Sequence, residues 1–279
     1  MNKTLIRSNA KVNLSLNVLG RKKNGFHNIQ SIYSFLDYHD EIYIRSIKGG
    51  KHRIKFKGKF SKNIKNNSVS KLLKILDEKK LLKNRYDIQI KKKIPLKSGL
   101  GGGSMNASAL LSYFLKKKII KLTKNEIFNI CNHIGSDVVL GLKKKNSILI
   151  NNNLIKNFNV KLGFFVILIK PRKGCSTKEI YRRVNKFSRN KIKSSSSVFK
   201  INFLKNAQND LEMPAFKLYP VLRKLKVFLS NVDDVKFVRM TGSGSAILAY
   251  FINKKSAING LKLLKKNFKN YWSILSKTI

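Results

Sequence analysis

The segment from Pro95 to Asn106 constrains this chain more than any other, because four glycines fall within five of its positions. It follows an alternating, strand-like run and precedes an apolar, helix-like one. Glycine lacks a Cβ atom, so its backbone adopts positive φ and lets a ligand approach closely. A helix that begins there, with Ser104 as the expected N-cap, directs free N–H groups and the positive end of its dipole at the loop. Because such a loop binds phosphate, the segment predicts an enzyme that uses a nucleotide.

Two common phosphate-binding motifs do not fit this segment. A P-loop requires a lysine directly after its last glycine, and none follows here. A dinucleotide-binding fingerprint requires a third glycine, where this chain has Ser104. It also requires an acidic residue at the end of the next strand, which this chain lacks. A flexible glycine turn without a ligand remains the alternative interpretation.

The spacing of apolar residues predicts both strands and helices. Residues 12–18 alternate between apolar and polar, which indicates a half-buried strand. A 3.6-residue period begins at Ser68, and Thr123 with Glu126 forms a capping box that opens another helix. Further strands are expected at 29–35, 41–45, 53–56, 86–90, 164–169, 236–240 and 246–252, and further helices at 177–184, 209–218, 220–229 and 256–268.

A polar stretch at 151–159 predicts a domain boundary. We therefore expect one domain of residues 1–155 and a second of residues 156–279. The length of 279 residues suits either two ordinary domains or one large one.

The charge of the chain is strongly positive, with 60 Lys and Arg against 13 Asp and Glu, or +47. Basic surfaces bind nucleic acids, but specific binders usually concentrate their charge on one face. Here the lysines lie along nearly every segment. This favours compositional drift, a general enrichment in lysine without a binding role, over a nucleic-acid site. The excess charge would still attract an anionic small substrate.

The sequence also bears on the compartment. Cys131 and Cys175 have neither a metal-binding spacing nor a disulfide framework, so we expect two apolar fillers in a reduced protein. Polar residues interrupt the apolar positions of the N-terminus, which does not resemble a signal peptide. The longest apolar run, 164–169, is too short to span a bilayer. These features predict a soluble, cytoplasmic protein without a membrane partner.

Short motifs recur in a characteristic order along the chain. They are SNAKVNL at 8–14, GFHNIQ at 25–30, FLDYHD at 35–40, the glycine segment, IGSDV at 134–138, NDLE at 209–212 and TGSGS at 241–245. In these motifs the chain resembles the GHMP small-molecule kinases over nearly its whole length. The blocks at 25–30 and 35–40 resemble the branch whose substrate is a cytidine diphosphate derivative of methylerythritol.

This resemblance implies a fold and a reaction. The fold would be α+β, with an N-terminal α/β domain like that of a ribosomal protein and a C-terminal ferredoxin-like α/β domain. The reaction would move the γ-phosphoryl group of ATP to a hydroxyl of 4-(cytidine 5'-diphospho)-2-C-methyl-D-erythritol, on the non-mevalonate route to isoprenoids. Mg²⁺ is expected with ATP, its protein ligands are unknown, and the protein would be a monomer or a homodimer without a specific nucleic-acid partner.

Two alternatives stay open. The chain could be another GHMP kinase, of the homoserine or mevalonate type. It could also be a basic nucleic-acid-binding protein that has kept the same fold.

Carboxylates are scarce, so candidates for a catalytic base can be compared. Asp37, Asp40 and Glu41 are expected in a turn between strands, whereas Asp137 stands between a glycine and a pair of valines. An isolated aspartate at a turn is usually a cap. By the resemblance, Asp137 is the general base, and the ammonium of Lys11 favours the charged carboxylate and the substrate alkoxide.

The resemblance also assigns the binding residues. The residues expected to bind ATP are Pro95, Leu96, Lys97, Ser98, Gly99, Leu100, Gly101, Gly102, Gly103, Ser104 and Met105. The residues expected to bind the substrate are Asn13, Phe26, His27, Thr177, Tyr181, Gly242, Ser243 and Gly244. The cytosine ring would stack between Phe26 and Tyr181, although an isolated aromatic residue is more often part of a core.

The chain departs from the family pattern at three places. Lys97 stands where more glycine is usual, Met105 replaces a serine, and Val139 follows the Asp137 motif where proline is common. Met105 removes a hydroxyl that phosphate or a metal ion would otherwise contact.

Overall fold

The computed structural model describes residues 3–23, 25–62, 64, 67–151, 154–189 and 192–279. The chain forms two compact units. Unit 1 contains Met1–Lys11, Tyr38–Leu96 and Gly101–Lys144, and unit 2 contains Val12–Asp37, Lys97–Leu100 and Lys145–Ile279. The boundary expected between residues 155 and 156 stays a prediction, and residues 152–153 beside it lie outside the described residues.

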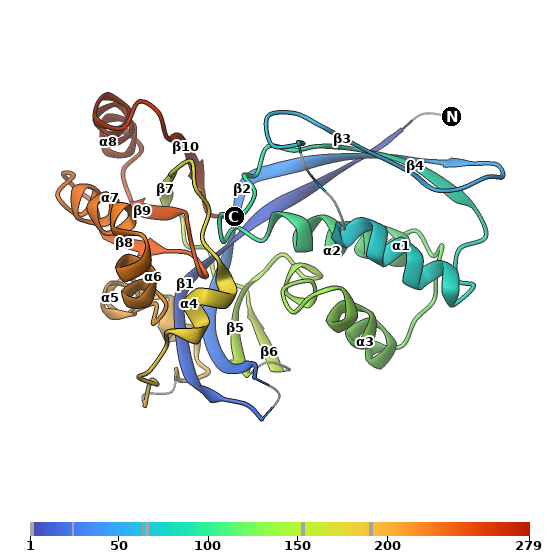
Figure 1. The fold of residues 1–279 in the computed structure, drawn as a ribbon, viewed down its shortest axis with the longest axis horizontal. Helices are drawn as coiled ribbons and strands as arrows, with labels where there is room; N and C mark the ends of the chain where they lie inside the picture. The colour runs from blue at the N-terminus through green and yellow to red at the C-terminus, as the bar shows by residue number, and fades with distance from the viewer. Residues whose placement is uncertain (1–2, 24, 63, 65–66, 152–153, 190–191) are drawn as a thin grey trace. The chain divides into compact units, whose positions relative to one another are not determined.

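Unit 1 packs helices against one face of a small sheet (Figure 1). Strand β3 runs parallel to β4, and β4 runs antiparallel to the second half of β2. The apolar side chains of β2 and β4 that face the helices, such as Ile44 and Ile88, are buried in one core with α1, α2 and α3. The elements are β1 (Thr4–Arg21) and β2 (His27–Ile47), which both continue into unit 2, and β3 (Arg53–Lys57), α1 (Ser68–Glu78), β4 (Arg85–Lys91), α2 (Gly102–Lys116), α3 (Lys124–Ile134) and the short 3₁₀ helix η1 (Val139–Gly141).

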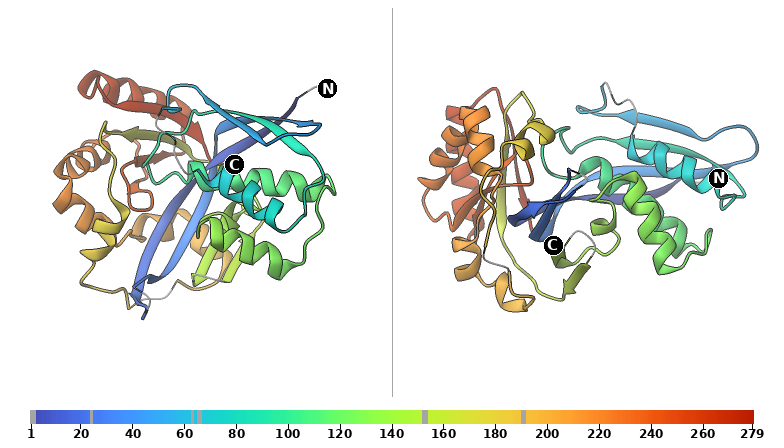
Figure 2. Two further views of the ribbon diagram at one scale, coloured as in Figure 1. Left: turned by 45° about the vertical axis from the view of Figure 1, so that its right-hand side comes forward. Right: turned by 60° about the horizontal axis from the view of Figure 1, so that its bottom comes forward.

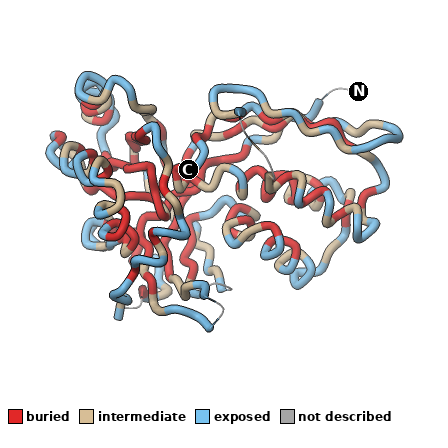
Figure 3. Tube along the Cα trace, viewed as in Figure 1, coloured by how far each residue is buried: buried red, intermediate tan, exposed pale blue. Residues whose placement is uncertain are grey.

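Unit 2 is built around an antiparallel sheet with the strand order β10-β7-β9-β8, covered by helices (Figure 2). Strands β8 and β9 are buried along their whole length (Figure 3). The first half of β2 pairs with β5, and β5 pairs with β6. The elements are β5 (Asn146–Asn151), β6 (Leu154–Phe158), β7 (Phe165–Lys170), α4 (Thr177–Arg182), η2 (Ser196–Phe199), α5 (Ile201–Asn206), α6 (Glu212–Leu218), α7 (Pro220–Ser230), β8 (Phe237–Met240), β9 (Ile247–Phe251), α8 (Lys254–Asn267) and β10 (Trp272–Lys277).

Local sequence signals explain several elements. Helix α1 begins at Ser68 as predicted, because Asn67 caps it and Val69, Leu72 and Leu76 face the core. Both hydrogen bonds of the predicted capping box at Thr123 are present at the start of α3. Helix α7 begins at Pro220 as predicted, since proline fits the first turn of a helix.

Three predictions about local structure are wrong. Strands 29–35 and 41–45 are one strand, β2, so Asp37, Asp40 and Glu41 do not lie in a turn. Asp40 is fully buried in this strand, where its carboxylate pairs with Lys92 and accepts the backbone N–H groups of residues 93 and 94. Ser104 is not the N-cap of α2. Gly101 occupies that position at φ +68°, so Ser104 lies inside the first turn.

Candidate active site

The glycine segment turns sharply at Gly99 because that residue packs against another loop of unit 2. Its φ is +77°, and a Cβ atom on it would lie 2.1 Å from the carbonyl oxygen of Thr241. The hydroxyl of Thr241 donates a hydrogen bond to the carbonyl oxygen of Gly99, at 3.2 Å. Ala246 N–H donates to the carbonyl oxygen of Ser98, at 3.0 Å. Residues 97–100 are therefore fixed against the TGSGS motif, with no room for a side chain at Gly99.

The continuation of the segment, in unit 1, forms the N-terminus of α2. Met105 N–H makes the first hydrogen bond of the helix, to the carbonyl oxygen of Gly101 at 2.8 Å. The N–H groups of residues 102–104 precede that bond and have no partner within the helix, as at every helix N-terminus. Together with the helix dipole they favour an anion.

Lys11 and Asp137 form an ion pair in unit 1, with Nζ and Oδ2 3.1 Å apart. Lys11 comes from β1, and its side chain is 4% exposed. Asp137 comes from the turn after α3, and its side chain is 39% exposed. The ammonium is thus held inside the protein, while the carboxylate is open to a ligand.

The ion pair adjoins the N-terminus of α2. A Cβ atom on Gly101 would lie 3.5 Å from Cε of Lys11, and one on Gly135 would lie 3.9 Å from Oγ of Ser104. Unit 1 therefore brings an ammonium, a partly exposed carboxylate and a helix N-terminus together. This arrangement can bind a phosphate group and take a proton from a hydroxyl beside it.

Sequence reasoning gave Lys92 no role near this site. Its side chain is 2% exposed and pairs with Asp40. A Cβ atom on Gly102 would lie 3.1 Å from its Nζ, so a second buried ammonium lies beside the start of α2. One lysine among so many gives no signal of its own, and only the buried partner Asp40 distinguishes it.

Met105, which departs from the family pattern, is buried in unit 1 at 3% exposure. A Cβ atom on Gly141 would lie 2.8 Å from its sulfur atom. The side chain therefore packs against η1 as an apolar filler and directs no polar group towards the N-terminus of α2.

The residues predicted to bind the substrate form contacts within unit 2. The rings of His27 and Tyr181 have centroids 5.0 Å apart, at an interplanar angle of 36°. Burial, and secondarily the charge of Arg21, lower the pKa of His27, so its imidazole is neutral at pH 7. Phe26 is 71% exposed, so it is not a core residue. The aromatic ring with which Tyr181 makes this contact is that of His27, the residue next to Phe26.

The other predicted substrate residues meet at the TGSGS motif. Oγ1 of Thr177 and Oγ of Ser243 lie 2.7 Å apart. Asn13 N–H donates to the hydroxyl of Thr241, at 3.0 Å, and a Cβ atom on Gly242 would lie 3.6 Å from Oδ1 of Asn13. Asn13 and Thr177 thus both contact the 241–244 turn, which joins β8 to β9.

Two residues of the NDLE motif form hydrogen bonds with the backbone at this turn. The amide nitrogen of Asn209 donates to the carbonyl oxygens of Met240 and Gly242, both at 2.8 Å. The carboxylate of Glu212 accepts the N–H of Met240, at 2.8 Å. Asn209 and Glu212 are buried and hold the backbone of the turn. The motif at 209–212 is the signal that could have identified these two residues, although the sequence alone does not indicate their role.

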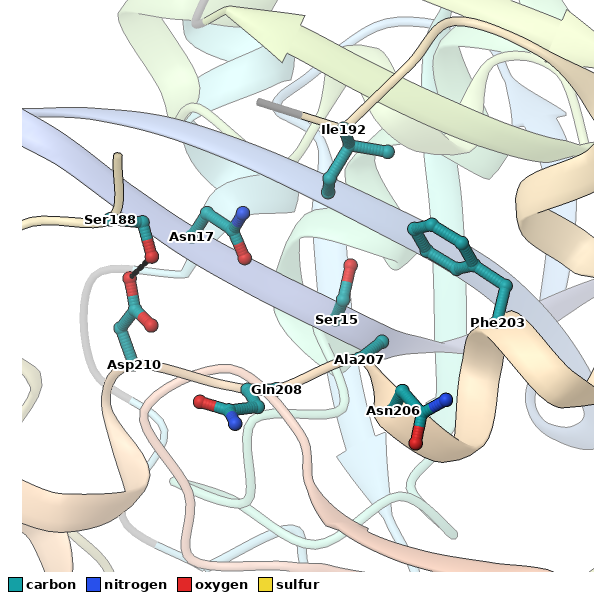
Figure 4. A pocket seen from close by; sticks show the side chains of 9 residues that line it. All are labelled: Ser15, Asn17, Ser188, Ile192, Phe203, Asn206, Ala207, Gln208 and Asp210. Atoms are coloured by element: carbon teal, nitrogen blue, oxygen red, sulfur yellow. Dashed lines mark hydrogen bonds between the residues drawn. The ribbon is translucent and has the colours of Figure 1, made fainter. Parts of the chain in front are cut away.

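A separate pocket of about 390 Å³ lies in unit 2 beside β1 (Figure 4). Its polar side chains include Ser15, Asn17 and Gln208, and Asp210 accepts a hydrogen bond from Ser188 at 2.7 Å. Among the described residues, none of those predicted to bind the substrate lines it.

Two further properties concern cofactors and membranes. Within the described ranges, no group of three or more His, Cys, Asp or Glu side chains is placed to hold a metal ion. No helix in the same ranges combines the length and apolar character needed to cross a membrane.

Comparison with known families gives two matches, one towards each end of the chain. The family described as GHMP kinases N terminal domain matches residues 67–144, and the family described as GHMP kinases C terminal matches residues 174–270. Together with the two sheets, these matches confirm the predicted fold class.

Named relatives match over almost their full length. A protein of Pelagibacter ubique named 4-diphosphocytidyl-2-C-methyl-D-erythritol kinase is 49% identical over 282 residues, covering 100% of both chains. A protein of the same name from Buchnera aphidicola is 33% identical and covers 95% of this chain and 92% of its own.

Solved structures show the same fold at lower identity. A crystal structure of 4-(cytidine 5'-diphospho)-2C-methyl-D-erythritol kinase has a TM-score of 0.79 at 20% identity, covering 99% of each chain. A homoserine kinase from Cytophaga hutchinsonii has a TM-score of 0.71 at 17% identity, covering 100% of this chain and 95% of its own. The fold is therefore shared by kinases with different substrates and does not by itself select one.

Proposed function

Because this chain belongs to the GHMP kinase family, we propose that it transfers the γ-phosphoryl group of ATP to a hydroxyl of 4-(cytidine 5'-diphospho)-2-C-methyl-D-erythritol. This reaction lies on the non-mevalonate route to isoprenoid precursors. The full-length relatives with that activity in their names support this substrate over others of the family.

One observation carries the proposed chemistry: the ion pair between Lys11 and Asp137 beside the N-terminus of α2. A phosphoryl transfer requires positioning, charge neutralisation and a group that takes the proton of the accepting hydroxyl. Asp137 is the partly exposed carboxylate of the pair and suits the role of general base. Lys11, held at 3.1 Å from it, orients that carboxylate and stabilises the developing alkoxide.

We propose that the triphosphate of ATP binds along residues 95–105. The backbone N–H groups at the start of α2 would contact phosphate oxygens, and the positive end of the helix dipole would stabilise their charge. Transfer then joins the acceptor oxygen to the γ-phosphorus, breaks the bond to the β-phosphate oxygen and leaves ADP, while the hydroxyl proton passes to Asp137.

Mg²⁺ fits this arrangement as an ion that the nucleotide brings with it. Such ions commonly bind one or two carboxylates together with substrate phosphates. In unit 1, Ser104 at the start of α2 offers a hydroxyl oxygen to such an ion, which would neutralise charge on the phosphates.

For the substrate, we propose that the cytosine ring stacks on Phe26 and Tyr181. The ring of Phe26 is 71% exposed, and the neutral imidazole of His27 can both donate to and accept from a pyrimidine edge. The turn at 242–244, with Thr177 beside Ser243, would contact the diphosphate.

We also propose that the enzyme works in the cytoplasm on these two small molecules, without a specific nucleic-acid partner. Cys131 and Cys175 are free thiols, both buried, as a reduced compartment permits. A monomer and a homodimer are both compatible with this proposal.

The test is an ATP-consumption assay with three acceptors: the cytidine diphosphate substrate, mevalonate and homoserine. We expect rapid turnover with the first and at most trace turnover with the others. Preference for mevalonate or homoserine would refute the substrate assignment. Absence of turnover with all three, together with salt-sensitive binding of nucleic acid, would support the binding-protein alternative.

A further inference from the structure

None of the described residues assigned to ATP and substrate lines a second and larger pocket in unit 2, although Asn209 and Glu212, which hold the 241–244 turn, are part of its lining. Its volume is about 1010 Å³, and it lies between the loop after α4 and helices α5, α6 and α7. Within the described part of the chain, its cationic lining consists of Arg183, Lys186, Lys205, Lys217, Lys226 and Arg239. Its acidic lining there consists of Asp210 and Glu212.

The two carboxylates of this pocket already have partners. Glu212 accepts hydrogen bonds from Lys226 and from the N–H of Met240. Asp210 accepts hydrogen bonds from the N–H of Val18 and the hydroxyl of Ser188, both at 2.7 Å. The cations outnumber these carboxylates, so the pocket carries a net positive charge.

Arg239 distinguishes the pocket from an ordinary basic surface. It is 5% exposed, its Nη2 donates to the carbonyl oxygen of Leu204 at 2.9 Å, and its guanidinium lies over the ring of Phe237. Its Nε is buried and has no hydrogen-bond partner among the described residues. A buried donor without a partner carries a free-energy penalty. Compositional drift adds lysines to the surface, but it does not bury an arginine.

We propose that this pocket is an anion-binding site for a small phosphorylated molecule, with Arg239 contacting its phosphate. A guanidinium binds phosphate through several N–H groups held in a fixed fork. Met213, 66% exposed, and Phe216 add apolar surface to the lining, so the ligand carries an organic group as well as the phosphate.

The methionines allow a site-resolved test on the whole protein. The chain has four, and Met213 lines this pocket while Met105 lies in α2 of unit 1. We would label the methionine methyl groups with ¹³C, assign Met213 with the variant Met213→Leu, and titrate with phenyl phosphate and with inorganic phosphate. We expect phenyl phosphate to shift the Met213 signal along a saturating curve, and to bind more tightly than inorganic phosphate.

Three variants separate the proposed site from general charge. Arg239→Lys keeps the charge but loses the paired donors, so we expect the dissociation constant of phenyl phosphate to rise about 10-fold or more. Lys217→Gln, which removes an outer cation of the pocket, should raise it roughly 2–5-fold. Lys262→Gln is the control, an exposed lysine of α8 that does not line the pocket, and should leave it unchanged.

Several outcomes would overturn the proposal. One is a Met213 signal that does not move or does not saturate. Another is equal weakening by Lys262→Gln and Lys217→Gln, which would indicate non-specific ion binding. A third is a Met213 shift produced by an RNA oligonucleotide and not by phenyl phosphate. Because the readout is binding at Met213, failure here is distinguishable from failure of the kinase assignment.

Discussion

Replacing Gly99 by alanine tests whether close backbone packing shapes the glycine loop. At φ +77° an alanine costs about 1–2 kcal/mol through its Cβ atom alone. The new Cβ atom would also lie 2.1 Å from the carbonyl oxygen of Thr241. Ordinary carbon–oxygen contacts are about 3.3 Å, so the two backbones must separate by roughly 1.2 Å.

That separation disrupts the hydrogen bond from Thr241 to Gly99 and strains the bond from Ala246 to Ser98. Overpacking costs about 1–3 kcal/mol, and a lost hydrogen bond about 0.5–1.5 kcal/mol. We therefore expect Gly99→Ala to lower the free energy of unfolding by about 2.5–6.5 kcal/mol.

Gly163→Ala is the matched control. Gly163 also lies in unit 2 and has φ +68°, and a Cβ atom on it would meet no other atom within 4 Å. Gly163→Ala should lower the free energy of unfolding only by the backbone strain of an alanine at positive φ, about 1–2 kcal/mol. The single tryptophan, Trp272, lies in β10 of unit 2, so its fluorescence during urea unfolding reports both variants. Equal losses of stability in the two variants would refute the argument from packing.

Three further predictions concern the site and the thiols. Asp137→Asn should lower kcat by ~10²–10⁴-fold while the affinity for ATP, measured by calorimetry, stays nearly constant; turnover like that of the unchanged enzyme would rule out the general base. Phe26→Ala should raise KM for the cytidine substrate, since base stacking contributes roughly 1–3 kcal/mol; a loss confined to ATP binding would contradict the assignment. Burial raises the pKa of Cys131 to about 12 and that of Cys175 to about 11. At pH 8 both thiols should therefore resist a disulfide reagent in the folded protein and react in urea, and rapid labelling of the folded protein would show that one is accessible.

Elements set by neighbouring residues were predictable from the sequence. The capping box at Thr123 and the apolar face of α1 depend on residues within one or two helical turns. Strand β2 was predicted as two pieces because Asp37 and Asp40 interrupt its apolar pattern. Their partners are distant in sequence: Asp37 accepts hydrogen bonds from Ser276 and from the N–H of Lys277. Asp40 is the buried one, and its pairing with Lys92 makes a carboxylate tolerable inside the strand. No local pattern predicts any of these partners.

Some features of the candidate site were likewise predictable from neighbouring residues, and others were not. The glycine segment predicted from local composition the helix N-terminus that α2 has, whereas phosphate binding by this loop stays a prediction. The cap itself was misplaced, because the chain enters α2 through a residue at φ +68°, a conformation that favours Gly101 over a residue with a side chain. Pairing of Lys11 with Asp137 followed only from the family resemblance, since neither residue carries a local signal of its partner.

The backbone of the turn at 241–244 has several buried hydrogen-bond partners. Asn209 and Glu212 form hydrogen bonds with the backbone of Met240, the last residue of β8. Asn13 and Gly99 form hydrogen bonds with the hydroxyl of Thr241. Each of these groups is buried or has no space for a larger side chain, so no one of them can be exchanged without leaving a polar group unsatisfied or a backbone displaced. A turn that only connected two strands would not require so many partners. We therefore infer that these contacts keep the backbone of residues 241–244 in one conformation, which the proposed contact with a diphosphate would require before the ligand arrives.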